Sequence, residues 1–108
     1  MLSYRHAFHA GNHADVLKHL VLVQLTRYLG RKDKAFWYID SHAGAGSYAL
    51  ESAQAAKLAE YRQGIARLWG RKDLPPAVAD YVDLVRRINP GGGLKVYPGS
   101  PDFALWTM

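Results

Sequence analysis

Apolar residues recur at helical spacing after Asn12, and the stretch ends at Gly30. Asn12 is a suitable N-cap, and Asp15, at the third helical position, resembles a short capping box. The apolar stripe consists of Ala14, Leu17, Val21, Leu25 and Tyr28, widened by Val16, Leu20 and Val23. A stripe this wide predicts a largely buried helix.

Two further stretches repeat this pattern in the second half of the chain. The first stops at Gly70 and has its apolar positions at Leu58, Tyr61, Ile65 and Leu68. The second begins at Pro75 and Pro76, with a stripe of Val78, Tyr81, Val82, Val85 and Ile88. Two amphipathic helices joined by a short polar link predict an αα-hairpin.

Strand-like patterns occur at residues 35–39 and 94–97. The first is followed by Gly44 and Gly46 and then by a helix-compatible segment from Tyr48, which predicts strand, tight turn and helix. Such a turn can cradle a ligand, with the helix start facing any anionic part of it. An ordinary turn with two glycines is an equally good interpretation of this segment alone.

The second strand leads into a corner, Pro-Gly-Ser-Pro at 98–101. Ser100 is expected to cap a short helix there. The large apolar residues at 103–108 suggest a chain that is cut inside an element.

Composition narrows the classes of function. The 108 residues fit one small domain, and a formal charge of +5 favours a polyanionic partner, with nucleic acid ahead of a membrane. The absence of cysteine excludes disulfides and thiolate metal sites, and with no signal peptide it favours the cytoplasm. The longest apolar run is too short to cross a bilayer.

Four of the five histidines lie in the first nineteen residues. His9 and His13 are four residues apart, but Gly11 and Asn12 between them argue against one continuous helix, and no acid completes a His-Glu-x-x-His pattern. The spacing therefore predicts no metal site.

Lys18 and His19 are the polar residues of the first helix that could serve a ligand. Spacing favours an ion pair between Lys18 and Asp15 at the helix surface. For His19, a structural histidine with its hydrogen bonds satisfied is the commoner role.

Three motifs occur together in order: an arm and first helix at 4–19, Asp-Ser-His-Ala-Gly-Ala-Gly at 40–46, and Tyr-Pro-Gly-Ser-Pro at 97–101. In this combination the chain, from its first residue to about Pro101, resembles the J family of 23S ribosomal RNA adenine-N6 methyltransferases. The resemblance implies an α/β, Rossmann-like fold with a helical αα-hairpin insert, and S-adenosylmethionine as the methyl donor. It also implies protein-free or partly assembled 23S ribosomal RNA as the partner.

The resemblance also implies roles for particular residues. Positions matching His19, His42 and Ser100 line the S-adenosylmethionine pocket in the family. The position matching Tyr4 contacts RNA, and those matching His6 and Lys18 lie where the target adenine enters. The implied organisation is an arm, helix, strand and cofactor turn at 1–49, a helical insert at 50–93, and a second strand with the start of a helix at 94–108.

The chain departs from the family in one important respect. Similar enzymes continue for more than a hundred residues and contain an Asp-Pro-Pro-Tyr motif that orients the adenine amine, and this motif is absent from the present sequence. We therefore expect an N-terminal part that is catalytically inactive alone and poorly stable, because a lone parallel strand leaves its edges unpaired.

Two other functions remain open on the sequence. One is a non-catalytic basic RNA-binding module that uses Arg5, Lys18 and the arginines of the hairpin: Arg62, Arg67, Arg71, Arg86 and Arg87. A solvated helix face is the simpler role for the hairpin residues. The other is a helical interaction domain whose glycine turn binds nothing.

Overall fold

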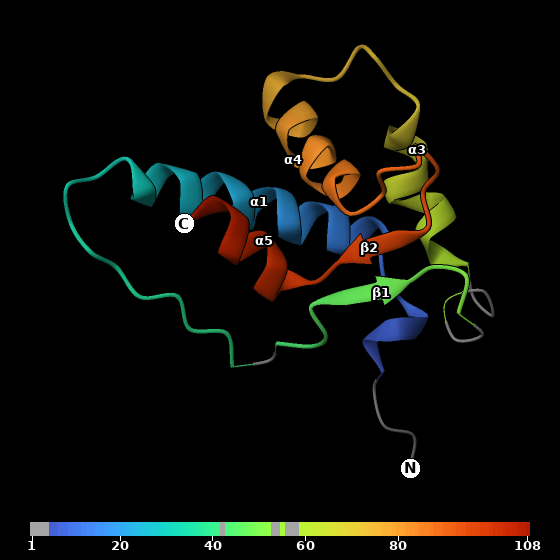
Figure 1. Cartoon of the computed structure of the whole chain (residues 1–108), viewed down its shortest axis with the longest axis horizontal. Helices are drawn as coiled ribbons and strands as arrows, with labels where there is room; N and C mark the ends of the chain where they lie inside the picture. The colour runs from blue at the N-terminus through green and yellow to red at the C-terminus, as the bar shows by residue number, and fades with distance from the viewer. Residues whose placement is uncertain (1–4, 42, 53–54, 56–58) are drawn as a thin grey trace.

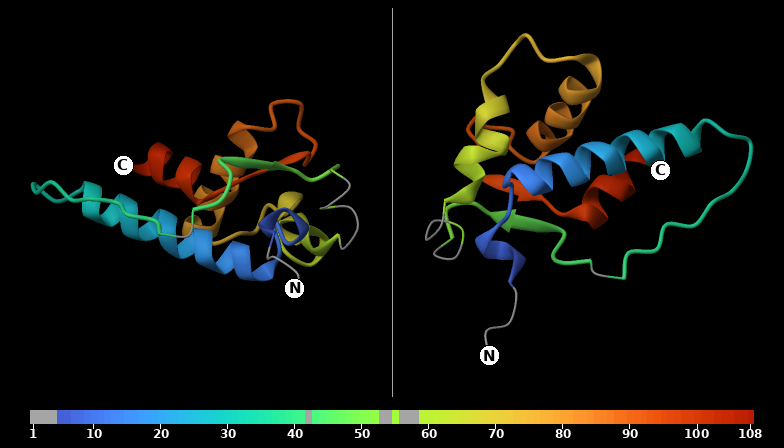
Figure 2. Two further views of the ribbon diagram at one scale, coloured as in Figure 1. Left: turned by 90° about the horizontal axis from the view of Figure 1, so that it is seen from below. Right: turned by 180° about the vertical axis from the view of Figure 1, so that it is seen from behind.

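The structure is a computed structural model that describes residues 5–41, 43–52, 55 and 59–108. A long helix, α1 (His13–Gly30), crosses the molecule, and α5 (Ser100–Thr107) lies beside it in each view (Figures 1 and 2). The remaining elements are η1 (His6–Phe8), β1 (Ser47–Ala49), η2 (Glu60–Gln63), α3 (Ile65–Trp69), α4 (Pro76–Arg87) and β2 (Val96–Pro98). Within the described residues, no helix is long and apolar enough to cross a membrane.

The start of α1 is set by the local signals predicted from the sequence. Asn12 is the N-cap, and its side-chain oxygen accepts a hydrogen bond from the Asp15 amide at 2.9 Å. The Asp15 carboxylate accepts from the Gly11 amide, one residue before the position that a standard capping box would use. The cap therefore also fixes the segment that precedes the helix.

The predicted buried face of α1 is wrong for its main stripe, but it holds for the residues that widened the stripe: Val23 is buried, and Val16 and Leu20 are partly buried against the core. Leu17 is 65% exposed and Leu25 is 54% exposed, whereas the buried positions of the helix are Asp15, His19, Val23 and Thr26. The helix is apolar around most of its circumference, so spacing alone did not identify the packed face. Contacts with α5 and α4 decide which side is buried.

The predicted first strand is also wrong. Residues 35–39 belong to no strand, and Trp37 and Ile39 are 88% and 79% exposed. In the described parts of the chain no strand lies beside this segment to pair its backbone. A β-rich composition is not sufficient where no pairing partner is available.

The sheet forms instead at a segment predicted to begin a helix. β1 pairs with β2 in antiparallel register, with Tyr48 opposite Tyr97 and Leu50 donating its amide to the Lys95 carbonyl. The described residues thus form a helix-rich fold with one two-stranded antiparallel sheet, and the expectation of a lone parallel strand is wrong.

The second half of the chain follows its sequence pattern more closely. α4 begins at Pro76 as predicted, and it buries Tyr81, Val82, Leu84 and Val85 in the core. The preceding helical stretch is divided at Gly64, where a side chain would collide with the Gly11 backbone, and it ends at Gly70 as expected. Leu58, the first position of its predicted stripe, lies outside the described residues.

The core joins elements that are distant in the sequence. Val23 of α1, Tyr81 and Val85 of α4, Tyr97 of β2 and Phe103 of α5 are completely buried. Because α1 and α5 share this core, the first turns of α1 are held close to the corner that starts α5.

Candidate functional site

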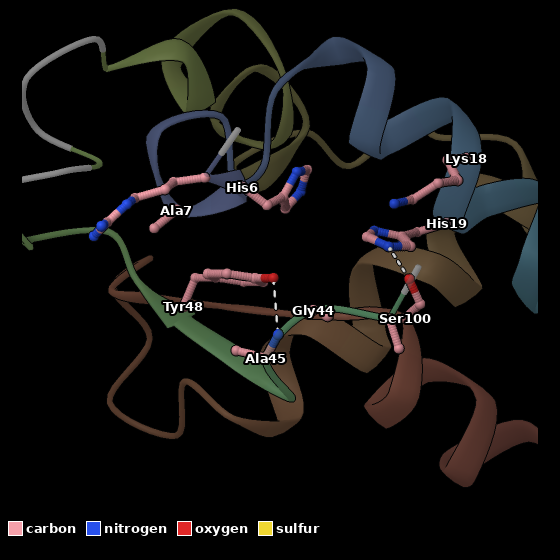
Figure 3. Close-up of a pocket in the computed structure, with 11 residues that line it drawn as sticks. His6, Ala7, Lys18, His19, Gly44, Ala45, Tyr48 and Ser100 are labelled. Carbon is pink, nitrogen blue, oxygen red and sulfur yellow. Dashed lines mark hydrogen bonds between the residues drawn. The ribbon is translucent and has the colours of Figure 1, made fainter. Parts of the chain in front are cut away.

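A cavity of about 540 Å³ lies between the first turns of α1, η1, the glycine turn (residues 43–46), β1 and the start of α5 (Figure 3). Its lining comes from all three sequence motifs and from Tyr48 of β1. The lining residues are Arg5, His6, Ala7, Lys18, His19, Ala43, Gly44, Ala45, Tyr48, Gly99 and Ser100. The volume is within the range of small-molecule sites in proteins.

His19 forms the buried wall of this cavity and is 1% exposed. Its Nδ1 lies 2.7 Å from the Tyr97 hydroxyl and its Nε2 lies 3.3 Å from Ser100 Oγ, so the expected hydrogen-bonded histidine is present. Burial is the main cause that lowers the pKa of His19 from 6.5 to about 4, although the Asp15 carboxylate opposes it. The imidazole is therefore neutral near pH 7.

Ser100 does not cap α5 as predicted. Gly99 is the N-cap, Ser100 is the first helical residue, and its hydroxyl points to His19 (Figure 3). The Gly99 amide donates to the Gly46 carbonyl at 2.7 Å, and a Cβ at Gly99 would lie 2.0 Å from the Ala45 carbonyl oxygen. This close approach brings the glycine turn against the start of α5.

The glycine turn forms another wall of the cavity. Its Ala45 amide donates to the Tyr48 hydroxyl at 3.0 Å, and a Cβ on Gly44 would lie 2.2 Å from that oxygen. A side chain at position 44 would therefore displace Tyr48 or fill part of the cavity. The turn leads into β1, so the prediction of a helix starting directly after it is wrong, and the helix that begins at this cavity is α5.

A buried carboxylate organises the cationic side of the cavity. Asp15 accepts a hydrogen bond from His6 Nε2 at 2.6 Å, and Lys18 Nζ lies 3.6 Å from its other oxygen, as the spacing predicted. Burial by itself raises the pKa of the Asp15 carboxyl, but the hydrogen bonds from His6 and from the Gly11 amide contribute to a net lowering. Asp15 thus stays ionised and holds both side chains beside the cavity.

The structure brings together four of the six residues singled out from the sequence: His6, Lys18, His19 and Ser100. Tyr4 and His42 lie outside the described residues, although their neighbours Arg5 and Ala43 line the cavity.

Sequence reasoning missed the contribution of Tyr48, which was expected on a helix. It also missed the contact between Tyr97 and His19. The motif around 97–101 contained Tyr97, but nothing in its spacing pointed to a partner 78 residues away.

His9 and His13 take no part in this cavity. His9 pairs with Glu60 at 2.9 Å, and His13 is exposed on the first turn of α1. Among the described residues, no three potential metal ligands lie close enough together to hold a metal ion.

Comparisons with known proteins identify the family to which the chain is similar. The family model described as "Ribosomal RNA large subunit methyltransferase D, RlmJ" matches residues 33–107. Ribosomal RNA large subunit methyltransferase J of Escherichia coli (strain K12) is 54% identical over 101 residues, and that of Haemophilus influenzae is 52% identical over 102 residues. Each match covers 94% of this chain and 36% of the relative, so the chain spans about a third of the length of these relatives.

A solved structure is also similar. The crystal structure of protein LPL1258 from Legionella pneumophila superposes with a TM-score of 0.83 at 40% identity, over 92% of this chain and 36% of that protein. The helix-rich fold described above is thus similar to about a third of that protein. Given the family match over residues 33–107, the chain belongs to the RlmJ family of ribosomal RNA large subunit methyltransferases.

Proposed function

We propose that this chain is the N-terminal part of an S-adenosylmethionine-dependent 23S ribosomal RNA adenine-N6 methyltransferase, and that the cavity is its share of the cofactor pocket. The observation that carries the proposal is the convergence of His6, Lys18, His19 and Ser100 on one cavity in a chain of this family. The cytoplasm, where ribosomal RNA is processed, is the corresponding proposed location.

The residues present suit such a cofactor. The cavity is large enough for a nucleoside with an amino-acid arm, and its glycine edge allows a ligand to lie against the backbone. His19 and Ser100 would hold the cofactor, together with His42 by resemblance. Because burial keeps the pKa of His19 near 4, the imidazole adds no positive charge beside a sulfonium.

S-adenosylmethionine would supply an electrophilic methyl group at this site. The chain's own residues would bind the cofactor on the glycine-turn side and admit RNA on the side of η1. There the positive charges of Lys18 and Arg5 would attract RNA phosphates. His6 and Tyr4 belong to the N-terminal arm that, by the family resemblance, contacts the RNA. Asp15 would keep His6 and Lys18 in place through the contacts described above.

Methyl transfer to an adenine amine also needs acceptors that orient its hydrogens, since the nitrogen lone pair is delocalised into the ring. The 108 residues contain no Asp-Pro-Pro-Tyr motif to do this. We therefore expect this polypeptide alone to bind cofactor without transferring methyl groups.

Two experiments test the proposal. Incubation of the chain with unmodified 23S ribosomal RNA and radiolabelled S-adenosylmethionine should give no incorporation, with the E. coli relative as positive control. Joining the chain to the remaining C-terminal part of that relative should then restore N6-methyladenosine formation, detected by mass spectrometry of digested RNA. Incorporation by the isolated chain would disprove its predicted inactivity, and a folded fusion that methylates another atom would disprove the adenine-N6 assignment.

The second candidate is a non-catalytic basic RNA-binding module, favoured by the formal charge of +5 and by the exposed Arg62, Arg67, Arg86 and Arg87. It predicts RNA affinity that falls steeply with salt and does not depend on the cofactor. Calorimetry with S-adenosylhomocysteine separates the two functions, because only the methyltransferase proposal predicts binding in the cavity.

A further inference from the structure

A line of hydrogen-bonding groups connects the centre of the core to the cavity. The hydroxyls of Tyr81 and Tyr97 are 2.8 Å apart, and Tyr97 Oη lies 2.7 Å from His19 Nδ1. On the other side of the ring, His19 Nε2 lies 3.3 Å from Ser100 Oγ. Both tyrosines are completely buried, so water cannot replace these contacts.

The direction of donation along this line follows from the number of hydrogens available. A neutral imidazole donates through one nitrogen and accepts through the other. Within the described residues, the Tyr81 hydroxyl has Tyr97 as its hydrogen-bond partner. If donation ran from Ser100 towards the core, the buried Tyr81 hydrogen would have no acceptor, and a buried donor without an acceptor is strongly unfavourable.

The opposite direction satisfies each buried donor. Tyr81 donates to Tyr97, Tyr97 donates to His19 Nδ1, and His19 Nε2–H donates to Ser100 Oγ. Burial also raises the pKa of both phenols, so Tyr81 and Tyr97 retain their hydrogens near neutral pH. The imidazole is then fixed in its Nε2–H tautomer.

We propose that Tyr97 is a positioning residue that fixes this tautomer and thereby leaves the Ser100 hydroxyl hydrogen directed at the cavity. Ser100 already accepts from His19, so its remaining hydrogen serves a ligand acceptor such as a carboxylate or hydroxyl oxygen. The statement about the tautomer stands on this chain alone, whereas the statement about the ligand rests on the proposed function.

Nitrogen-15 NMR of the imidazole rings in the full 108-residue chain tests the tautomer directly. At about pH 7 the His19 spectrum should show a protonated Nε2 and a hydrogen-bonded, unprotonated Nδ1. In Tyr97→Phe the Nδ1 resonance should move towards that of a free acceptor. A protonated Nδ1 in the unaltered chain would overturn the proposal even if the variant failed to fold.

Tyr81→Phe is the matched control. It removes a neighbouring buried hydroxyl from a ring of the same type, but it leaves the hydrogen bond between Tyr97 and His19 in place. The His19 nitrogen resonances should therefore change little in Tyr81→Phe. Equal changes in the two variants would contradict a specific role for Tyr97.

Calorimetry with S-adenosylhomocysteine tests the consequence for ligand binding. We expect about tenfold weaker binding in Tyr97→Phe and in Ser100→Ala, and less than a twofold change in Tyr81→Phe. Unchanged affinity in Tyr97→Phe would overturn the ligand part of the inference. If the unaltered chain did not bind, the proposed cofactor site would fail, and the NMR result would still decide the tautomer.

Discussion

Lowering the pH should destabilise this chain through His19. The buried imidazole has a pKa of about 4 in the folded chain, against 6.5 as its ordinary value. The unfolded chain therefore binds the proton more readily, so this contribution to stability is present above about pH 6.5 and is lost as the pH falls towards 4.

The size of the effect follows from the shift. At 1.36 kcal/mol per pKa unit, complete protonation would cost about 3 kcal/mol, of which about 2 kcal/mol is lost between about pH 7 and about pH 5. Asp15 contributes little in that interval, because its pKa is lowered from 3.8 and its contribution is lost only at lower pH. The change in stability between these two pH values is therefore attributed to histidine and not to Asp15.

Urea unfolding at the two pH values measures the effect. With a denaturant slope of about 1 kcal/mol per molar, the midpoint should fall by about 2 M on acidification. His19→Gln is the control, because an amide can still donate and accept hydrogen bonds with Ser100 and Tyr97 but does not titrate. Equal pH dependence in the two proteins would refute the assignment to His19.

Two further predictions concern the stability of the packing around β2 and the start of α5. Gly99→Ala should cost about 1–3 kcal/mol of unfolding free energy, because its Cβ would meet a backbone oxygen at 2.0 Å. Gly70→Ala, where nothing lies within 4 Å, should change stability by less than about 0.5 kcal/mol, and a similar loss in both variants would contradict the crowding at Gly99. Asn89→Ala should lower the unfolding free energy by about 3 kcal/mol. The buried Asn89 side chain donates to the carbonyls of Val85 and Val96 and accepts from the amides of Lys95 and Val96, and these four hydrogen bonds connect α4 to the start of β2. Thermal unfolding checks Asn89, and a change below about 1 kcal/mol would contradict that network.

The predictions from sequence succeeded where the signal is local. Asn12 caps α1 through a contact three residues away. Pro76 begins α4 because its ring fixes φ at a helical value, and Gly70 is the C-cap of α3, as the sequence predicted. The ion pair between Asp15 and Lys18 likewise follows from helical spacing. Each of these features depends on a few neighbouring residues.

The predictions failed where a distant partner decides the outcome. Tyr48 lies in a strand because Tyr97 is available to pair with it, and residues 35–39 lack such a partner in the described chain. Leu17 is exposed because α5 packs against another side of α1. The resemblance gathered His19 and Ser100 into one expected pocket, but their direct contact and the link to Tyr97 required the fold.

The proposed function requires that the cavity between α1, the glycine turn and α5 binds the S-adenosyl cofactor. Titration of S-adenosylhomocysteine into the nitrogen-15-labelled chain, followed through its amide resonances, tests this most directly. We expect saturable shifts at His19, Gly44, Ala45, Gly99 and Ser100, with little change along the exposed face of α4. The absence of saturable shifts, or shifts confined to the arginines of α3 and α4, would contradict it.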